Sequence, residues 1–379
     1  MDIQNELLRV FPAFLTAALI TFLFVRFIIS FVRDEKIYDE IDLKVLYLKV
    51  TAILGGLGIF IGFVLSYTFW SSTFGFHEFK YILTGVILLF FIGLIDDVIG
   101  LTPNKKLIAQ ILASVIIIYF GGIRITDLYG VFGIHALPEW ASIGITLLAI
   151  IGITNSFNLI DGIDGLAGGI GMIISATFGI IFFVGGEYAF STLAFALCGS
   201  LVAFLYFNFH PAKIFMGDTG AFIIGFVVSI LAVKFIEFNS MQHLEANVSP
   251  LVFSAPAVGI GILILPVFDT LRVFVVRIIN GHSPFTSDLG HIHHLLLDKG
   301  FNPLQACVIL YAVNIFFIFE VLALQNIGTV PLLLLVVGTA LFFTFLLTRL
   351  PHKESIRSLT KEEIKEYKEV IRTRLGQKI

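Results

Sequence analysis

Eleven apolar runs recur along the chain, and each is long enough to cross a hydrocarbon core of about 30 Å as a helix. They fall near residues 10–32, 50–70, 81–99, 105–122, 139–157, 166–185, 188–207, 219–236, 250–278, 305–325 and 328–349. The ninth run contains Pro256, Gly259, Gly261 and Pro266, so it predicts a broken helix. The pattern therefore predicts an all-α polytopic membrane protein with about eleven transmembrane helices.

Composition favours the same class. Of the 379 residues, 58% are hydrophobic and 13% are charged, whereas an ordinary soluble domain carries about 25% charged residues. A bilayer suits such a chain, because lipid-facing side chains need no polar outer shell and the backbone is satisfied inside helices. The net charge of −3 gives no basic field that would attract nucleic acid.

The basic residues predict an orientation. Most of them lie in the segments 33–49, 100–106, 208–218, 270–304 and 349–379, which share one side of the membrane. The positive-inside rule then places the N-terminus outside and the C-terminus in the cytoplasm. Residues 1–349 form the membrane domain, whose first run stays as an uncleaved anchor. Residues 350–379 form a charged tail, either an amphipathic helix on the membrane surface or a solvated segment.

Carboxylates gather where two of these runs end on the cytoplasmic side. Asp96 and Asp97 close the third run. After the fifth run, Asn158, Asp161 and Asp164 recur every three residues, which places them on one face if the segment is helical. Interleaved glycines would let a ligand phosphate or another backbone approach closely. The alternative is a glycine-rich turn with capping aspartates, but capping needs only one such residue.

Two further polar segments lie on the same side. The first runs from Asn208 to Gly220 and holds Asp218 in a Gly-Asp-Thr-Gly turn, where it is either a helix N-cap or an oxygen ligand. The second, in the longest inner segment, carries His291, His293 and His294. Zinc is one interpretation, but closely spaced histidines without a cysteine cannot close a tetrahedral shell by themselves. Together with Arg272 and Arg277, they fit better as donors to a nucleotide or a diphosphate.

The coincidence of these groups on one side predicts a cation site. Carboxylates with few lysines nearby repel one another unless a cation lies among them. Magnesium takes one or two carboxylates and completes its octahedral shell with water and phosphate oxygens. We therefore expect Mg²⁺, with Mn²⁺ as an alternative ion.

The motifs resemble the polyprenyl-phosphate N-acetylhexosamine-1-phosphate transferase superfamily, glycosyltransferase family 4. Four stretches carry the resemblance in order between about residues 50 and 300: DDVIG, NLIDGIDGLAGG, FMGDTG, and SPF followed by HIHH. The HIHH form is similar to the branch that uses N-acetylglucosamine 1-phosphate. The resemblance implies transfer of a sugar phosphate from a UDP-N-acetylhexosamine to undecaprenyl phosphate, with release of UMP, at the cytoplasmic face of the bacterial inner membrane. Whether the chain forms a homodimer stays open.

The resemblance also implies residue roles. Asp218 matches the magnesium aspartate, with Asn158 sharing the metal. Asp96 and Asp97 match the acidic pair near the lipid phosphate, and Asp161 and Asp164 match the loop at the nucleotide, so all four are expected at the catalytic centre. Asn208, Arg272 and Arg277 join the three histidines as expected substrate-binding residues. Direct attack by the lipid phosphate is favoured over a covalent intermediate on Asp97.

The chain departs from the family pattern at three positions. Tyr47, Ile53 and Leu289 stand where basic or imidazole side chains are usual, so these contacts to the lipid phosphate and the sugar are not expected here. Two alternatives to the transferase stay open. One is a phospho-N-acetylmuramoyl-pentapeptide transferase, and the other is a non-catalytic relative or a transporter.

Overall fold

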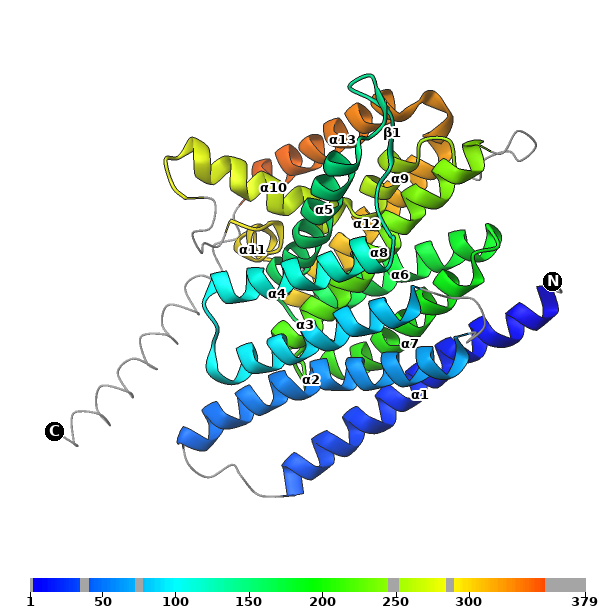
Figure 1. Ribbon diagram of the computed structural model, residues 1–379. Coiled ribbons are helices and arrows are strands. Elements are labelled where there is room, and N and C mark those ends of the chain that lie inside the picture. The colour runs from blue at the N-terminus through cyan, green and yellow to red at the C-terminus, as the bar shows by residue number, and fades with distance from the viewer. Residues whose placement is uncertain (1–2, 35–40, 72–77, 245–251, 284–289, 352–379) are drawn as a thin grey trace.

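The computed structural model describes residues 3–34, 41–71, 78–244, 252–283 and 290–351, and almost all of this part is helical (Figure 1). The α-helices are α1 (Ile3–Asp34), α2 (Ile41–Trp70), α3 (Phe79–Ile99), α4 (Pro103–Val115), α5 (Glu139–Ile160), α6 (Leu166–Val184), α7 (Tyr188–Asn208), α8 (Gly217–Leu244), α9 (Ala255–Ile262), α10 (Ile264–Ile279), α11 (Ile292–Asp298), α12 (Pro303–Leu324) and α13 (Thr329–Arg349). A π-helical turn, Ile116–Phe120, continues α4, and a 3₁₀ turn, Gln325–Ile327, follows α12.

The helices coincide with the predicted apolar runs. Within the described ranges, nine helices are long and apolar enough to cross a membrane: α1, α3, α4 with its π-helical turn, α5, α6, α7, α8, α12 and α13. The described part of α2 contributes a shorter apolar helix, Leu54–Trp70. The prediction of an all-α polytopic membrane protein is confirmed at this level. The predicted charged tail falls outside the described residues from residue 352 onward.

The ninth run forms two helices, as its prolines and glycines predict. The helix α9 ends at Ile262, and α10 begins two residues later at Ile264. Leu263, between them, has φ −92° and ψ 8°, which lies outside the helical region. Pro266 has no N–H to donate to the carbonyl of Ile262, so the helical ladder lacks one bond at this point.

One element was not predicted. A short antiparallel hairpin, β1 (Asp127–Val131) and β2 (Ile134–Ala136), lies between α4 and α5. Strands of five and three residues are too short to give a clear alternating pattern in the sequence. The Tyr129 hydroxyl donates to the Ile236 carbonyl at 2.9 Å, which ties the hairpin to α8.

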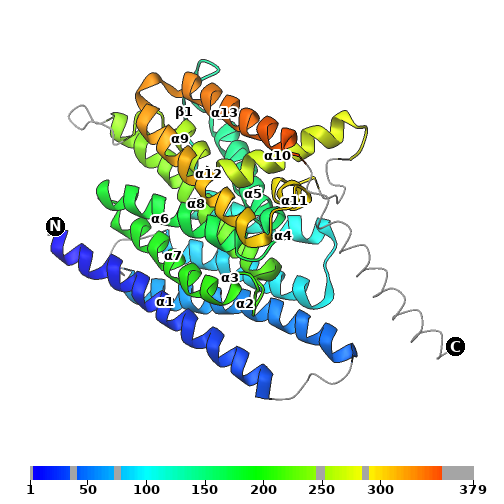
Figure 2. The ribbon, with the colours of Figure 1, turned by 180° about the vertical axis from the view of Figure 1, so that it is seen from behind.

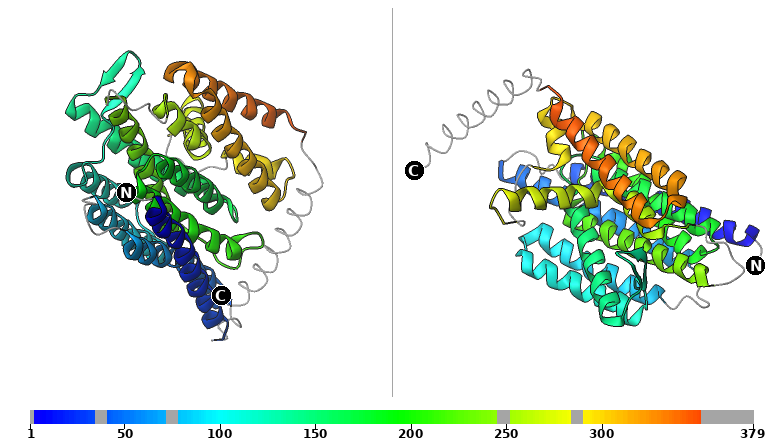
Figure 3. Two further views of the ribbon diagram at one scale, coloured as in Figure 1. Left: turned by 90° about the vertical axis from the view of Figure 1, so that its right-hand side faces the viewer. Right: turned by 90° about the horizontal axis from the view of Figure 1, so that it is seen from above.

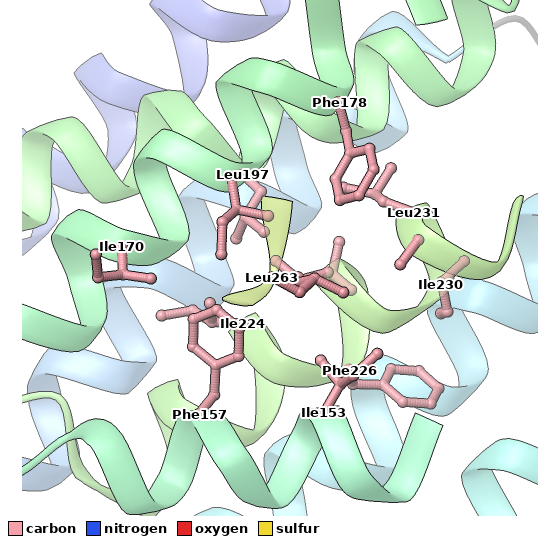
Figure 4. Packing of buried hydrophobic residues seen from close by; sticks show 14 of the residues in the cluster. Ile153, Phe157, Ile170, Phe178, Leu197, Ile224, Phe226, Ile230, Leu231 and Leu263 are labelled. Atoms are coloured by element: carbon pink, nitrogen blue, oxygen red, sulfur yellow. The ribbon is translucent and has the colours of Figure 1, made fainter. Parts of the chain in front are cut away.

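The helix α8 forms the centre of the bundle. It packs against α2, α3, α5 and α6, whereas α1 and α13 lie along opposite edges (Figures 1 and 2). Ile224, Phe226 and Ile230 of α8 meet Ile153 and Phe157 of α5 in the interior (Figure 4). Because lipid tails are as apolar as these side chains, close packing stabilises this contact more than transfer out of water does.

Glycines allow the start of α8 to lie against α2 and α3. A Cβ at Gly93 of α3 would lie 2.5 Å from the Thr219 Cα, and one at Gly56 of α2 would lie 2.6 Å from the Gly220 nitrogen. Both distances are below any real Cβ contact, so neither position accepts a side chain while the backbones keep this spacing. The first turn of α8 is therefore held between two helices by direct backbone contact.

We predict that Gly93→Ala lowers the thermal stability of the purified protein, because the added methyl would push the start of α8 away from α3. Thermal unfolding in detergent measures this. Gly144→Ala in α5 is the matched control, since a Cβ at this glycine would meet no atom of a neighbouring element within 4 Å. Equal midpoints for the two variants would contradict the close approach.

Candidate active site

Asp97 binds the N-terminus of α8. Its Oδ1 accepts from the backbone N–H of Asp218 at 2.8 Å, and its Oδ2 accepts from the N–H of Thr219 at 3.1 Å and from the Thr219 hydroxyl at 2.6 Å. The first N–H groups of a helix have no partner inside the helix and carry a partial positive charge, so a carboxylate is well placed there. Gly217, at φ +67°, makes room, since a Cβ at this residue would lie 2.7 Å from the Asp97 carboxylate.

Asp218 lies in a cluster with three polar side chains. The Lys106 ammonium donates to its Oδ2 at 2.6 Å, and the Asn158 amide donates to its Oδ1 at 2.9 Å. The same ammonium forms an ion pair with Asp96, which is 8% exposed. The Leu101 N–H donates to the other oxygen of Asp96 at 2.6 Å. Two carboxylates from α3 and α8 thus converge on one cation from α4.

Asp161 lies in the short loop between α5 and α6 and faces the cluster. Burial, followed by the charges of Asp218, Asp97 and Asp164, raises the pKa of the Asp161 carboxyl to about 7. A carboxyl perturbed in this way is typical of a functional site. A second cation among these carboxylates would favour the charged form of Asp161.

The side chains of Asp164 and Asn208 form hydrogen bonds with groups near the start of α6 and in the segment before α8. Asp164 Oδ2 lies 2.9 Å from His210 Nδ1 and accepts from the Ala212 N–H at 3.2 Å. Asn208 is buried, accepts from the Gly165 N–H at 2.9 Å and donates to the Ile214 carbonyl at 2.8 Å. Both side chains therefore join the α5–α6 loop to the segment before α8. Their predicted roles at the nucleotide remain predictions.

A buried carboxylate organises the histidine segment. Asp269 of α10 accepts from Arg272 at 2.7 Å and lies 3.0 Å from His291 Nδ1. It also accepts from the Ile292 N–H at 3.1 Å, at the start of α11. Arg277 is buried further along α10. Asp269 thus fixes the position of both predicted binding residues, His291 and Arg272.

His293 lies against the α5–α6 loop. It is 1% exposed, and neither ring nitrogen has a hydrogen-bond partner among the described residues. Burial lowers the pKa of its imidazole to about 3, so the ring is neutral. A Cβ at Gly162 would lie 2.1 Å from the Nε2 atom of His293. The ring centroids of His293 and His294 are 4.2 Å apart. The histidine segment and the acidic loop therefore form one site with an unsatisfied imidazole between them.

The donor set fits magnesium better than zinc. Across the described ranges, no three His, Cys, Asp or Glu side chains are grouped so as to hold a metal by themselves. Magnesium needs only one or two carboxylates, and Asp96 and Asp218 already face a common cation, Lys106. Asn158 donates its amide to Asp218 in this arrangement, so its predicted place beside the metal remains a prediction.

Sequence reasoning missed two residues of the site. In the sequence, Lys106 is one of several basic residues that set the orientation, although its position nine residues after Asp97, across the short turn between α3 and α4, is a signal for it. Asp269 lies inside the ninth apolar run, where an ionisable residue is itself a sign of function. The side chains of Tyr47 and Ile53, and the whole of Leu289, lie outside the described residues.

Comparison with known proteins finds relatives over most of the chain. Residues 79–236 match glycosyl transferase family 4. The probable undecaprenyl-phosphate N-acetylglucosaminyl 1-phosphate transferase of Bacillus subtilis (strain 168) is 29% identical over 346 residues, which cover 90% of this chain and 92% of the relative. The decaprenyl-phosphate N-acetylglucosaminephosphotransferase of Mycobacterium leprae (strain TN) is 33% identical over 286 residues, which cover 69% of this chain and 70% of the relative.

A third relative is more distant. The undecaprenyl-phosphate alpha-N-acetylglucosaminyl 1-phosphate transferase of Escherichia coli (strain K12) is 25% identical over 315 residues, covering 80% of this chain and 81% of that protein. All three names describe the same type of phosphotransferase, and all three matches cover most of the chain.

We predict that the metal-free protein loses stability as the pH rises from about 4 to about 7, in part through Asp161. An ordinary Asp has a pKa near 3.9 when unfolded, whereas the folded value is about 7. Between these values the native state holds more protons, so raising the pH favours unfolding. Thermal unfolding in EDTA should show that Asp161→Asn loses less stability over this pH range than the wild type does. Glu139→Gln, at the far end of α5, should follow the wild type, and identical profiles for all three proteins would contradict the prediction.

Proposed function

The chain belongs to glycosyl transferase family 4, and on that premise we propose that it transfers N-acetylglucosamine 1-phosphate from UDP-N-acetylglucosamine to undecaprenyl phosphate. The convergence of Asp96 and Asp218 on Lys106, with Asn158 donating to Asp218 beside the histidine segment, carries the proposal. A reaction between two phosphate-bearing substrates needs such a mixed set of cationic, neutral and metal-binding groups at one place.

The transfer is a displacement at phosphorus. An oxygen of the lipid phosphate attacks the phosphorus that bears the sugar, and the bond from that phosphorus to the bridging oxygen breaks. The products are a lipid diphosphate sugar and UMP, which leaves with the bridging oxygen. A phosphate monoester has a second pKa near 6 and is largely dianionic at pH 7, so no strong base is required. The main obstacle is repulsion between the two anionic substrates.

The residues present can reduce this repulsion. Lys106 provides a positive charge next to Asp218, and Arg272 provides another next to the histidine segment. The His293 ring nitrogens have no hydrogen-bond partner among the described residues, so a group of the nucleotide sugar that reaches this buried ring could bind there. When bound, magnesium would be held by Asp218 and Asp96 and would neutralise charge on the diphosphate. Fixed groups of this kind stabilise developing charge without having to reorganise.

The contacts of Asp97 support direct attack by the lipid phosphate. Both of its oxygens accept hydrogen bonds from the start of α8, three bonds in total. A nucleophilic carboxylate would have to give up this cap, which is worth about 1 kcal/mol or more. Asp97 is better suited to holding Asp218 in position.

We also propose the full membrane arrangement. The nine long apolar helices, the apolar part of α2 and the α9–α10 pair give eleven crossings. The basic segments support a position for the shared end of α3, α5 and α8, and hence for the site, on the cytoplasmic side of the inner membrane. A water-soluble nucleotide sugar and a membrane lipid can meet at this surface.

The activity assay uses purified protein with undecaprenyl phosphate and a panel of UDP-sugars, and it measures UMP release. We expect release to require Mg²⁺, to be fastest with UDP-N-acetylglucosamine and to stop in EDTA. Asp218→Ala and Lys106→Gln should each lower the rate by about 100-fold or more, the scale of a lost electrostatic contact in a transition state.

Lys80→Gln is the control, because this exposed lysine lies at the opposite end of α3 from Asp96 and Asp97. It should keep the wild-type rate. Full activity in Asp218→Ala, or nucleotide-sugar binding without turnover by the wild type, would refute the proposed transferase.

A further inference from the structure

A polar cavity lies between α1 and α7, away from the residues of the active site. It has a volume of about 290 Å³ and is lined by Phe22, Arg26, Tyr206, Phe207 and Lys213, among others. The aromatic rings and Arg26 come from α1 and α7, and Lys213 comes from the segment between α7 and α8.

Arg26 is unusual for its position. It is the only charged residue in the apolar span Val10–Phe31. An ionisable side chain inside a span is costly and is ordinarily paired with an opposite charge. Neither Arg26 nor Lys213 forms an ion pair with an acidic side chain in the described part of the chain, and no acidic side chain lines the cavity there.

The depth of Arg26 indicates where a counter-charge would come from. It precedes the end of α1 at Asp34 by eight residues, or about 12 Å of helix. An arginine at this depth can extend its side chain toward the membrane surface. Tyr206 is 68% exposed beside it, and an aromatic ring of this kind is favoured at the level of lipid head groups. Among the residues that the structure describes, the cavity thus combines two cations that have no acidic partner with an interfacial aromatic side chain.

We propose that this cavity binds the phosphodiester head group of an anionic phospholipid in the cytoplasmic leaflet. Basic pockets between transmembrane helices on this side are suited to such head groups. The catalytic carboxylates come from α3, α8 and the α5–α6 loop, whereas α1 lies along the outer edge of the bundle (Figure 3). That separation favours a resident phospholipid over the reacting lipid phosphate.

The cavity is connected to the catalytic centre through the chain. The Lys213 N–H donates to the Phe207 carbonyl at 2.8 Å, and Asn208 donates to the Ile214 carbonyl at 2.8 Å. The segment then reaches Asp218 five residues after Lys213. A phosphate held by Arg26 and Lys213 would therefore join α1 to the segment that leads to Asp218.

Native mass spectrometry of the detergent-purified protein tests the site without measuring activity. Phosphatidylglycerol should be retained more strongly than phosphatidylcholine. Each basic residue near a membrane surface changes lipid affinity about fivefold, so Arg26→Gln and Lys213→Gln should each weaken phosphatidylglycerol binding by about that factor, and the double variant by roughly 30-fold. Lys80→Gln removes one charge elsewhere and should bind as the wild type does.

Three controls decide the interpretation. Thermal unfolding shows whether each variant is folded, and Arg26→Lys should keep most of the binding if the charge is what matters. Inorganic phosphate should not displace phosphatidylglycerol. Unchanged phosphatidylglycerol binding in the folded double variant, or equal retention of the neutral lipid by the wild type, would overturn the proposal. So would displacement of phosphatidylglycerol by equimolar undecaprenyl phosphate, which would assign the cavity to the substrate.

Discussion

The cap that Asp97 provides for α8 is the interaction on which the rest of the site depends. It joins the end of α3 to the start of the central helix through two backbone N–H groups and one hydroxyl. The close approach at Gly56 and Gly93 holds the same turn from two sides. Because Asp218 is the second residue of α8, its carboxylate has little freedom once these contacts form. The two adjacent aspartates therefore have different roles, because Asp97 binds the backbone at the start of α8 and Asp96 forms an ion pair with Lys106.

Charge balance explains how so many carboxylates lie close together at a helix end. Lys106 neutralises part of the charge on Asp96 and Asp218, and the α8 N-terminus partly offsets Asp97. Asp161 has no such partner among the described residues, and burial, followed by the charges of the neighbouring carboxylates, raises the pKa of its carboxyl. The site thus retains excess negative charge, which a bound divalent cation would offset. On the other side, Asp269 compensates Arg272 and orients His291, while His293 stays neutral between the two halves.

The sequence predicted the helices well because bilayer thickness and backbone hydrogen bonding determine them almost directly. It also predicted that the acidic segments and the histidine segment lie at the same end of the bundle, because alternate breaks between membrane spans lie on the same side of the membrane. It could not tell which of two adjacent aspartates would cap a helix, because that depends on how α3 meets α8. Nor could it separate Lys106 from other basic residues, or show that Asn208 is satisfied by two backbone groups. Those outcomes follow from packing between segments far apart in the chain.

Electron paramagnetic resonance of bound Mn²⁺ tests most directly whether these carboxylates form a divalent cation site. One Mn²⁺ per chain should bind to the wild type and be displaced by Mg²⁺. Asp218→Ala should lose the bound signal, whereas Asp164→Asn, which removes a carboxylate that faces His210 instead, should keep it. A wild-type protein without bound Mn²⁺, or an Asp218→Ala variant that binds it normally, would contradict the site.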